Sequence, residues 1–331
     1  AIRGTISVGS FVAFGMYLTM LTWPMIALGW VVNLFQRGDA SMGRLAEILD
    51  VRPAIGGEEP VQHLPPTASG RTIEFRNVGF HYPSDPAGQP RWVLRNVSFT
   101  VPAGATFGVV GATGSGKSAL IDLIPRMYDP QEGDILIDGV PTRRVRPDEL
   151  RREIGFVPQE SLLFSDTVGA NLSYGTDDSE SAEWSAGVAQ LDQTIEEFPG
   201  KYETILGERG INLSGGQKQR ASLARALARK PSIVLLDDAL SAVDTHTEAE
   251  ILRALREAMA GRTALIASHR ISAIRDASWI IVLEKGTLVE QGRHSELMAM
   301  RGRYWSLLRR QQLLDAVESD TLATDVPATT I

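Results

Sequence analysis

Two adjacent carboxylates, Asp237 and Asp238, are the residues of this sequence that most directly suggest chemistry. They end the apolar run "SIVLL", which predicts a buried strand that delivers both acids to the edge of a sheet. A carboxylate in such a place can hold Mg²⁺, and a second one can take a proton from water. Because Asp238 is one methylene shorter than glutamate, its reach toward a water depends on what the rest of the chain binds.

A glycine-rich segment, "GATGSGKS" (residues 111–118, the phosphate loop), matches G-x-x-x-x-G-K-[ST]. It lies between the expected strand "TFGVV" and the expected helix "SALIDLIPRMY", which is the context this motif needs. We expect Lys117 to reach the β- and γ-phosphates of a nucleotide, and Ser118 and Asp237 to ligate Mg²⁺. The predicted nucleotide-binding residues of this loop are Gly111, Ala112, Thr113, Gly114, Ser115, Gly116, Lys117 and Ser118.

A second loop of similar character, "LSGGQ" (residues 213–217, the signature loop), precedes an expected helix over "QKQRASLARALARK". Ser214 is well placed to cap that helix, and its positive N-terminal end attracts anions. A capped helix explains Ser214 but not Gly215 and Gly216, which leave the backbone open to a ligand. We therefore expect the segment from Ser214 to Gln217 to close on a nucleotide that another subunit holds.

The elements that must position these loops read as an α/β domain over residues 71–312. The runs "TIEFRNV", "VLRNVSFTV", "TFGVV", "SIVLLD" and "TALIAS" predict strands, and helical stretches such as "TEAEILRALREAMA" alternate with the later ones. Early strands without intervening helices, followed by this alternation, predict a mixed sheet.

The N-terminal residues predict one transmembrane helix. Residues 4–36 contain no Asp, Glu, Lys, Arg or His, and about 20 apolar residues cross a bilayer. We expect the span at residues 11–32, with a kink at Pro24. A signal peptide would have a shorter apolar region and a small-residue cleavage site, and a buried soluble helix would be shorter. Arg37 and Arg44 beyond the span favour a cytoplasmic exit.

The predicted organisation is a transmembrane helix with a cytoplasmic extension (1–50), a linker (51–70), the α/β domain (71–312) and an acidic, disordered tail (313–331). The linker has four prolines and three glycines in twenty residues, which is typical of a connecting segment. The net charge of −7 argues against nucleic acid as a partner. The absence of cysteine excludes disulfides and thiolate sites.

The phosphate loop, the signature loop and the acidic strand end, in this order, resemble the nucleotide-binding domain of an ABC transporter. With the preceding helix, residues 5–312 are similar to a multidrug-type ABC exporter half-transporter. The resemblance implies ATP and Mg²⁺ as cofactors, and a second half-transporter, a lipid bilayer and an exported substrate of unidentified class as partners. It implies a P-loop nucleotide-binding fold in which a helical subdomain accompanies the mixed sheet. It also implies head-to-tail packing of two domains, in which the signature loop completes the partner's site. It also implies a bacterial cytoplasmic membrane, with the ATP-binding domain in the cytoplasm.

The resemblance assigns roles to further positions of this chain. Tyr82 in "FHYPSD" would stack on adenine, although a core or turn tyrosine is the alternative. Gln159 in "GFVPQE" would touch Mg²⁺ or its water, and His269 in "IASHR" would hydrogen-bond the γ-phosphate. The segment "GERG", residues 207–210, would contact the partner's membrane helices. Asp244 matches an acid of the D-loop (residues 239–244), but it can also cap the helix that follows.

The second acid departs from the family pattern, which has glutamate at the position of Asp238. The resemblance assigns catalysis to Asp238, His269, Lys117 and Gln159. A shorter base predicts good ATP binding but slow hydrolysis. With an intact signature loop, the chain resembles the degenerate-site member of a heterodimeric exporter. Alternatives are an active homodimeric exporter in which Asp238 suffices, a regulatory ATP-binding module, and a soluble ABC protein, which the membrane helix disfavours.

A second departure concerns the membrane part. Half-transporters of this family carry six membrane helices, and this sequence contains one and begins without Met. It looks like the C-terminal part of a longer protein, so the substrate pocket would lie mostly in helices outside it.

Overall fold

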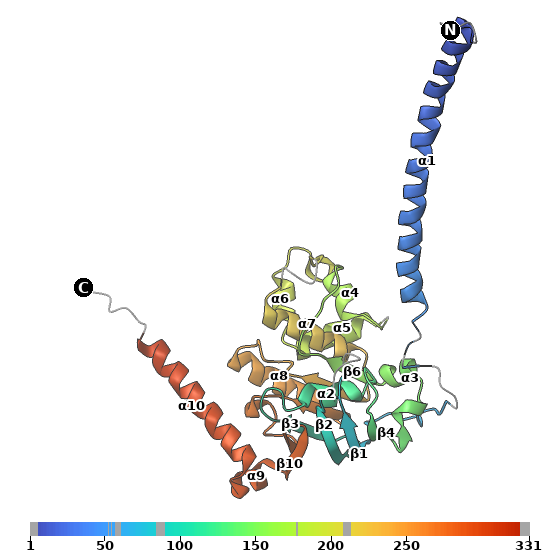
Figure 1. Ribbon diagram of the computed structural model, residues 1–331. Coiled ribbons are helices and arrows are strands. Elements are labelled where there is room, and N and C mark those ends of the chain that lie inside the picture. Colours follow the sequence, from blue (N-terminus) through green and yellow to red (C-terminus); the bar gives the residue numbers. More distant parts are fainter. Residues whose placement is uncertain are drawn as a thin grey trace. The chain divides into compact units, whose positions relative to one another are not determined.

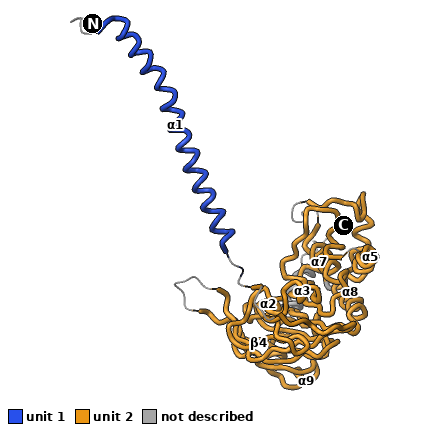
Figure 2. Tube along the Cα trace, turned by 90° about the vertical axis from the view of Figure 1, so that its right-hand side faces the viewer, with its two compact units in different colours: residues 1–54 blue, residues 55–331 orange. Residues whose placement is uncertain are grey.

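A computed structural model describes residues 6–51, 53, 55–56, 61–83, 90–176, 178–207 and 213–324. The chain divides into two compact units, residues 1–54 and residues 55–331, which are coloured separately in Figure 2. Each unit is described here by itself.

The first unit is one long helix, α1 (Val8–Leu49). The Ser7 hydroxyl caps it by accepting a hydrogen bond from the Ser10 N–H, and Pro24 lies inside it. None of its residues is buried against the protein, and its best 18-residue window has a mean hydropathy of 1.6. Among the described residues, α1 is the helix that is long and apolar enough to cross a membrane. It contains the predicted span at 11–32.

The second unit begins before the predicted α/β domain. Three backbone N–H groups of residues 61–70 donate to it: Gln62 to the Arg144 carbonyl at 2.8 Å, Leu64 to Glu149 Oε1 at 2.9 Å, and Gly70 to the Gly261 carbonyl at 2.6 Å. The second half of the predicted linker 51–70 is therefore attached to the domain.

Two sheets form the centre of this unit (Figure 1). An antiparallel sheet has the order β2 (Leu94–Val101), β1 (Ile73–Phe80), β4 (Glu132–Ile137) and β5 (Val140–Pro141). A six-stranded sheet has the order β10 (Thr287–Gly292), β9 (Trp279–Glu284), β3 (Thr106–Val110), β8 (Thr263–Ala267), β7 (Ile233–Asp237) and β6 (Ile154–Val157). Only β10 and β9 pair antiparallel in it. The predicted mixed α/β fold is confirmed.

The central strand β7 shows why the apolar runs are continuous. Its alternate side chains enter two different cores, because successive strand residues point to opposite faces. Ile233 and Leu235 pack in the core that includes α2 (Lys117–Leu123) and the antiparallel sheet. Val234 and Leu236 pack in the core that includes α7 (Gly215–Ala228) and α8 (Thr245–Ala258). The strand is buried on both faces, and its carboxyl end brings Asp237 to the edge of the sheet.

Short helices gather around α7 and form the helical subdomain at the other end of this unit from the sheets (Figure 1). They are α4 (Val168–Leu172), α5 (Ser179–Val188) and α6 (Asp192–Glu196), with the 3₁₀ turn η2 (Lys201–Glu203). The N-caps Thr167, Asp178 and Ser214 accept a backbone N–H at the starts of α4, α5 and α7.

The remaining elements are α3 (Pro147–Arg152), α9 (His294–Met300), α10 (Arg303–Thr324) and the 3₁₀ turns η1 (Thr142–Arg144) and η4 (Ile271–Ala273). Helix α10 differs from expectation, because it covers part of the segment 313–331 that composition predicts to be disordered. No Gly or Pro interrupts this sequence between residues 303 and 324, and its Leu, Ala and Gln residues favour a helix.

Candidate functional site

A cleft of about 380 Å³ lies beside the phosphate loop. Its lining residues come from six separate parts of the chain, and the sequence predicts that five of these parts, all but Val93, act on one nucleotide. Its lining residues are Tyr82, Val93, Thr113, Gly114, Gly116, Lys117, Ser118, Ala119, Gln159, Asp238 and His269. Every predicted catalytic residue lines this cleft, whereas the signature loop does not.

The phosphate loop joins the end of β3 to the start of α2. Gly114 (φ +77°) and Gly116 (φ +105°) occupy the left-handed region, which glycine enters without strain. A Cβ at Gly116 would lie 2.7 Å from Leu94 Cδ2, so the backbone approaches the core closely. The Ser115 hydroxyl is buried and has no hydrogen-bond partner. A loop that packs closely on the core and carries an unpartnered buried polar atom fits a phosphate-binding cradle.

Lys117 lies inside this loop, with its side chain buried. Its Nζ donates to the Gly111 carbonyl at 2.9 Å and to the Ala112 carbonyl at 3.3 Å. Burial lowers the pKa of Lys117, and the nearby charges of Asp238 and Asp237 oppose that shift. The amine is therefore held within the loop by two backbone carbonyls, which phosphate oxygens can replace as acceptors.

Asp237 is the last residue of β7 and is buried. Burial raises the pKa of Asp237 and the charge of Asp238 adds to this, whereas Ser118 and Lys117 favour the ionised form. The described residues contain no group of three His, Cys, Asp or Glu side chains that could hold a metal by itself. The pair Ser118 and Asp237 fits Mg²⁺, which usually takes one or two protein ligands and completes its shell with phosphates and water.

Asp238 and His269 form a direct pair at the other side of the cleft. The His269 backbone N–H donates to Asp238 Oδ1 at 3.2 Å, and His269 Nδ1 lies 2.8 Å from Asp238 Oδ2. The Asp238 side chain is only 10% exposed, whereas that of His269 is 51% exposed. Asp238 has φ +47°, a conformation that Asp and Asn adopt more readily than other non-glycine residues.

Tyr82 is half-exposed at the cleft and is held by two other rings. Its ring meets Phe80 edge-on at 5.0 Å and Tyr128 edge-on at 5.2 Å. These contacts hold the ring of Tyr82 beside the cleft, where a base could meet it. Gln159 is exposed and follows β6 by two residues.

Ser214 and Gln217 of the signature loop form a reciprocal capping box at the N-terminus of α7. Ser214 Oγ accepts the Gln217 N–H at 3.2 Å, and Gln217 Oε1 accepts the Ser214 N–H at 2.8 Å. Ser214 and Gly215 are exposed, and none of the loop lines the chain's own cleft. The loop is thus free to meet a ligand outside this chain.

Asp244 ends the D-loop and caps α8. Its Oδ1 accepts the Thr247 N–H at 3.0 Å, and this hydrogen bond lowers the pKa of Asp244. The capping alternative therefore has a structural basis, and the family role stays a prediction. Of the segment 207–210, residues 208–210 lie outside the described residues.

Four residues near these loops were missed by the sequence reasoning: Asp122, Gln219, Ser241 and Arg270. Asp122 lies on α2, and burial raises its pKa to about 6, with a contribution from the charge of Asp237. Gln219 and Ser241 hydrogen-bond to each other at 2.9 Å. The sequence does contain one indication of Gln219, because this polar residue shares the apolar face of α7 with Leu223 and Leu227.

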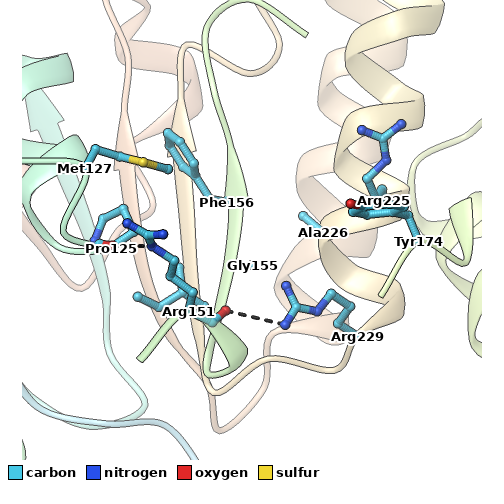
Figure 3. Close-up of a pocket in the computed structure, with 10 residues that line it drawn as sticks. Pro125, Met127, Arg151, Gly155, Phe156, Tyr174, Arg225, Ala226 and Arg229 are labelled. Atoms are coloured by element: carbon cyan, nitrogen blue, oxygen red, sulfur yellow. Dashed lines mark hydrogen bonds between the residues drawn. The ribbon is translucent and has the colours of Figure 1, made fainter. Parts of the chain in front are cut away.

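A second hollow, of about 200 Å³, lies between β6 and α7. Figure 3 shows Met127 and Phe156 on one side of it and Tyr174 and Arg225 on the other. Arg225 donates to the carbonyls of Leu162 and Asn171 at 2.9 Å each. Arg225 therefore connects α7 to the segments around Leu162 and Asn171. Strand β6 lines this hollow and leads, two residues after its end, to Gln159.

Comparisons with known proteins agree with this geometry. Residues 94–241 match the family model described as "ABC transporter". The chain is 42% identical over 318 residues to "Probable multidrug resistance ABC transporter ATP-binding/permease protein YheI" of Bacillus subtilis (strain 168), covering 96% of this chain and 53% of that protein. It is 40% identical over 320 residues to "Multidrug resistance-like ATP-binding protein MdlA" of Escherichia coli (strain K12), covering 96% and 53%.

A solved structure described as "Structure of a bacterial Atm1-family ABC exporter with ATP bound" is also similar. Its TM-score is 0.79 at 38% identity, over 94% of this chain and 54% of that chain. The chain spans about half the length of the relatives that it matches. The second unit of this chain is therefore an ABC-type ATP-binding ATPase domain, similar to the corresponding parts of multidrug-resistance and Atm1-family ABC transporters.

Proposed function

We propose that this chain is the ATP-binding and hydrolysing subunit of a membrane exporter that works as a dimer. The observation that carries this proposal is the cleft, where the phosphate loop, Tyr82, Gln159, Asp238 and His269 converge. The membrane-length apolar helix α1 supports a place in a lipid bilayer, with the ATP-binding domain in the cytoplasm. The exported substrate belongs to parts of the transporter outside this sequence.

The residues of the cleft have different roles in ATP binding and hydrolysis. Tyr82 stacks on the adenine, and Lys117 leaves the carbonyls of Gly111 and Ala112 to bind the β- and γ-phosphates. His269 hydrogen-bonds the γ-phosphate. Ser118 and Asp237 would hold Mg²⁺, with Gln159 touching the ion or one of its waters, and the ion would neutralise charge that builds up on the phosphates.

Asp238 is the residue that receives a proton from the attacking water. Water oxygen bonds to the γ-phosphorus, the bond to the β-phosphate oxygen breaks, and ADP leaves. Each Asp238 oxygen already accepts one hydrogen bond from His269, and each retains a second acceptor position for water. Because the side chain is short and tied to His269, we infer that the water lies beyond its best reach and that hydrolysis is slow at this site.

The signature loop then acts on a different nucleotide. It is exposed, capped and absent from the chain's own cleft, which supports a role at the phosphate loop of a second half-transporter. We infer a non-identical partner with glutamate at the position of Asp238, so that one site of the pair is fast and one is slow.

A second candidate is an active homodimer. The observation in its favour is the 2.8 Å contact between Asp238 and His269, which gives the acid a fixed orientation. In that dimer Asp238 serves as an adequate base at both sites.

The test is ATP hydrolysis by the lipid-reconstituted protein, alone and with a half-transporter that carries glutamate at the position of Asp238. The heterodimer predicts low activity alone and a large gain on pairing, and the gain should disappear with Ser214→Ala. Brisk activity alone, with no gain on pairing, would establish the homodimer. Absence of ATP binding in both preparations would refute the proposed function altogether.

A further inference from the structure

Gln219 is a buried amide whose two ends are both hydrogen-bonded to the D-loop. The residue is 6% exposed and lies on α7, five residues after Ser214. Its Nε2 donates to Ser241 Oγ at 2.9 Å, and its Oε1 accepts the Ala242 N–H at 2.9 Å. A buried amide with both ends satisfied fixes the relative position of the segments it joins.

Ser241 connects this amide to the catalytic pair. Its N–H donates to the Asp238 carbonyl at 3.1 Å, and its own carbonyl accepts from Arg270 Nη2 at 3.2 Å. With the Gln219 contact, all three polar groups of Ser241 are used. Ser241 thus hydrogen-bonds to both Asp238 and Arg270, and Arg270 directly follows His269 in the chain.

Arg270 is itself fixed from the far side of the D-loop. Its Nη1 lies 2.6 Å from Glu248 Oε2, and the Glu248 side chain is only 4% exposed. The Ser272 hydroxyl donates to the other Glu248 oxygen at 3.3 Å. The D-loop therefore contacts a buried amide on α7 and the Arg270 side chain, which is paired with the buried Glu248 of α8.

The signature loop also packs directly on the D-loop. A Cβ placed on Gly216 would lie 2.7 Å from the Ala242 carbonyl oxygen, which is closer than a side chain can approach. Gly216 is thus required for this contact, in addition to leaving backbone exposed. The start of α7 is therefore connected to Ala242 both by this contact and by the hydrogen bond from Gln219.

We propose that Gln219 and Ser241 are positioning residues that tie the signature helix to the chain's own Asp238–His269 pair. Closing of the signature loop on the other subunit's nucleotide then sets the orientation of Asp238 at this chain's nucleotide. This inference rests on the proposed function, because it needs two nucleotides shared between two subunits. Neither Gln219 nor Ser241 lines the cleft, so both act through Asp238.

The test compares Gln219→Leu and Ser241→Ala with the wild type in the assembled, lipid-reconstituted dimer. We expect single-turnover hydrolysis at this chain's own site to fall about tenfold in Gln219→Leu. The Kd for a fluorescent ATP analogue that binds while the other site is empty should be unchanged within about twofold. The double variant should be no slower than Gln219→Leu, because both changes break the same link. Ser241→Thr keeps the hydroxyl and should restore the rate. Gln193→Leu, at an exposed site on α6, is the matched control.

Hydrogen exchange after addition of Mg²⁺ and ATP gives a readout that does not depend on turnover. In the wild type, protection of residues 215–219 and of the D-loop should rise together; in Gln219→Leu only residues 215–219 should gain protection. Joint protection in both proteins, or an unchanged rate in Gln219→Leu, overturns the inference. If Gln219→Leu does not fold, Ser241→Ala decides alone. A wild type that neither binds ATP nor gains protection indicates instead that the proposed function is wrong.

Discussion

Asp238 and His269 contact each other through both oxygens of the carboxylate, one on the backbone N–H at 3.2 Å and one on ring Nδ1 at 2.8 Å. The acid that should activate water therefore also orients the histidine that should bind the γ-phosphate. Because the imidazole Nδ1 is engaged, Nε2 is the ring nitrogen left to face the cleft. Substitutions at Asp238 should affect both functions at once.

Asp238→Glu should raise ATP hydrolysis at this chain's own site by about ten- to a hundredfold. The added methylene moves the carboxylate toward the water and restores the length that the family pattern has. The measurement is single-turnover release of phosphate with saturating ATP. Asp192→Glu, at an exposed position, should leave the rate unchanged. If Asp238→Glu is as slow as the wild type, side-chain length does not limit the reaction.

Lys117→Ala should weaken ATP binding by about 10- to 150-fold, because a hydrogen bond to a charged group contributes about 1.5–3 kcal/mol. The buried amine is the only cation among the residues that line the described cleft, apart from any charge on His269. Equilibrium binding of a fluorescent ATP analogue measures the effect. Lys230→Ala removes an exposed amine that pairs with Asp178 away from the cleft, and its Kd should match the wild type.

Tyr82→Ala should weaken ATP binding by about five- to tenfold, as the loss of an aromatic contact worth about 1 kcal/mol implies. Tyr82→Phe should bind normally, because stacking uses the ring and not the hydroxyl. Titration of both variants with ATP and with a triphosphate that lacks a base separates stacking from other effects. Equal weakening for the two ligands would argue against a base-stacking role.

Asp122 should make stability depend on pH. Burial raises its pKa in the folded protein to about 6, from an ordinary value of 3.8. Between these pH values the Asp122 carboxyl binds more protons in the folded state than in the unfolded state. The contribution of Asp122 to the free energy of unfolding is therefore fully present below about pH 4 and is lost as the pH rises through 6. Asp122→Asn should therefore raise the unfolding midpoint at pH 7.5 by roughly 2–6 °C, with little change at pH 4. Equal shifts at both pH values would exclude this carboxyl as the cause.

The sequence predicts those parts of the fold and of the site whose local residue pattern alone specifies their structure. The phosphate loop is recognisable because a strand, its glycines and a helix follow in order, and β7 because an apolar run must be buried on both faces. Strands β4 and β9 were not identified individually, because their short apolar runs look like any buried segment. Which strands pair is decided by contacts between residues far apart in the chain.

The same reasoning explains what was missed around the D-loop. Gln219 and Ser241 are ordinary polar residues in sequence, and their relation appears only when α7 and the D-loop are packed together. Arg270 follows His269 directly, but its partner Glu248 lies 22 residues away, on α8. Polar contacts between elements leave no periodic pattern in a sequence, so their positions depend on the tertiary structure.

The sharing of Ser241 between Gln219, Asp238 and Arg270 has a consequence for how the two ATP sites of a dimer influence each other. A coupling free energy between two binding sites is reciprocal. If a closed signature loop favours one orientation of Asp238, then a nucleotide that favours this orientation must favour closing of the signature loop by the same factor. A coupling of about 1–3 kcal/mol corresponds to about a 5- to 150-fold change in affinity. An ATP analogue trapped at one site would then change the affinity of the other without touching it.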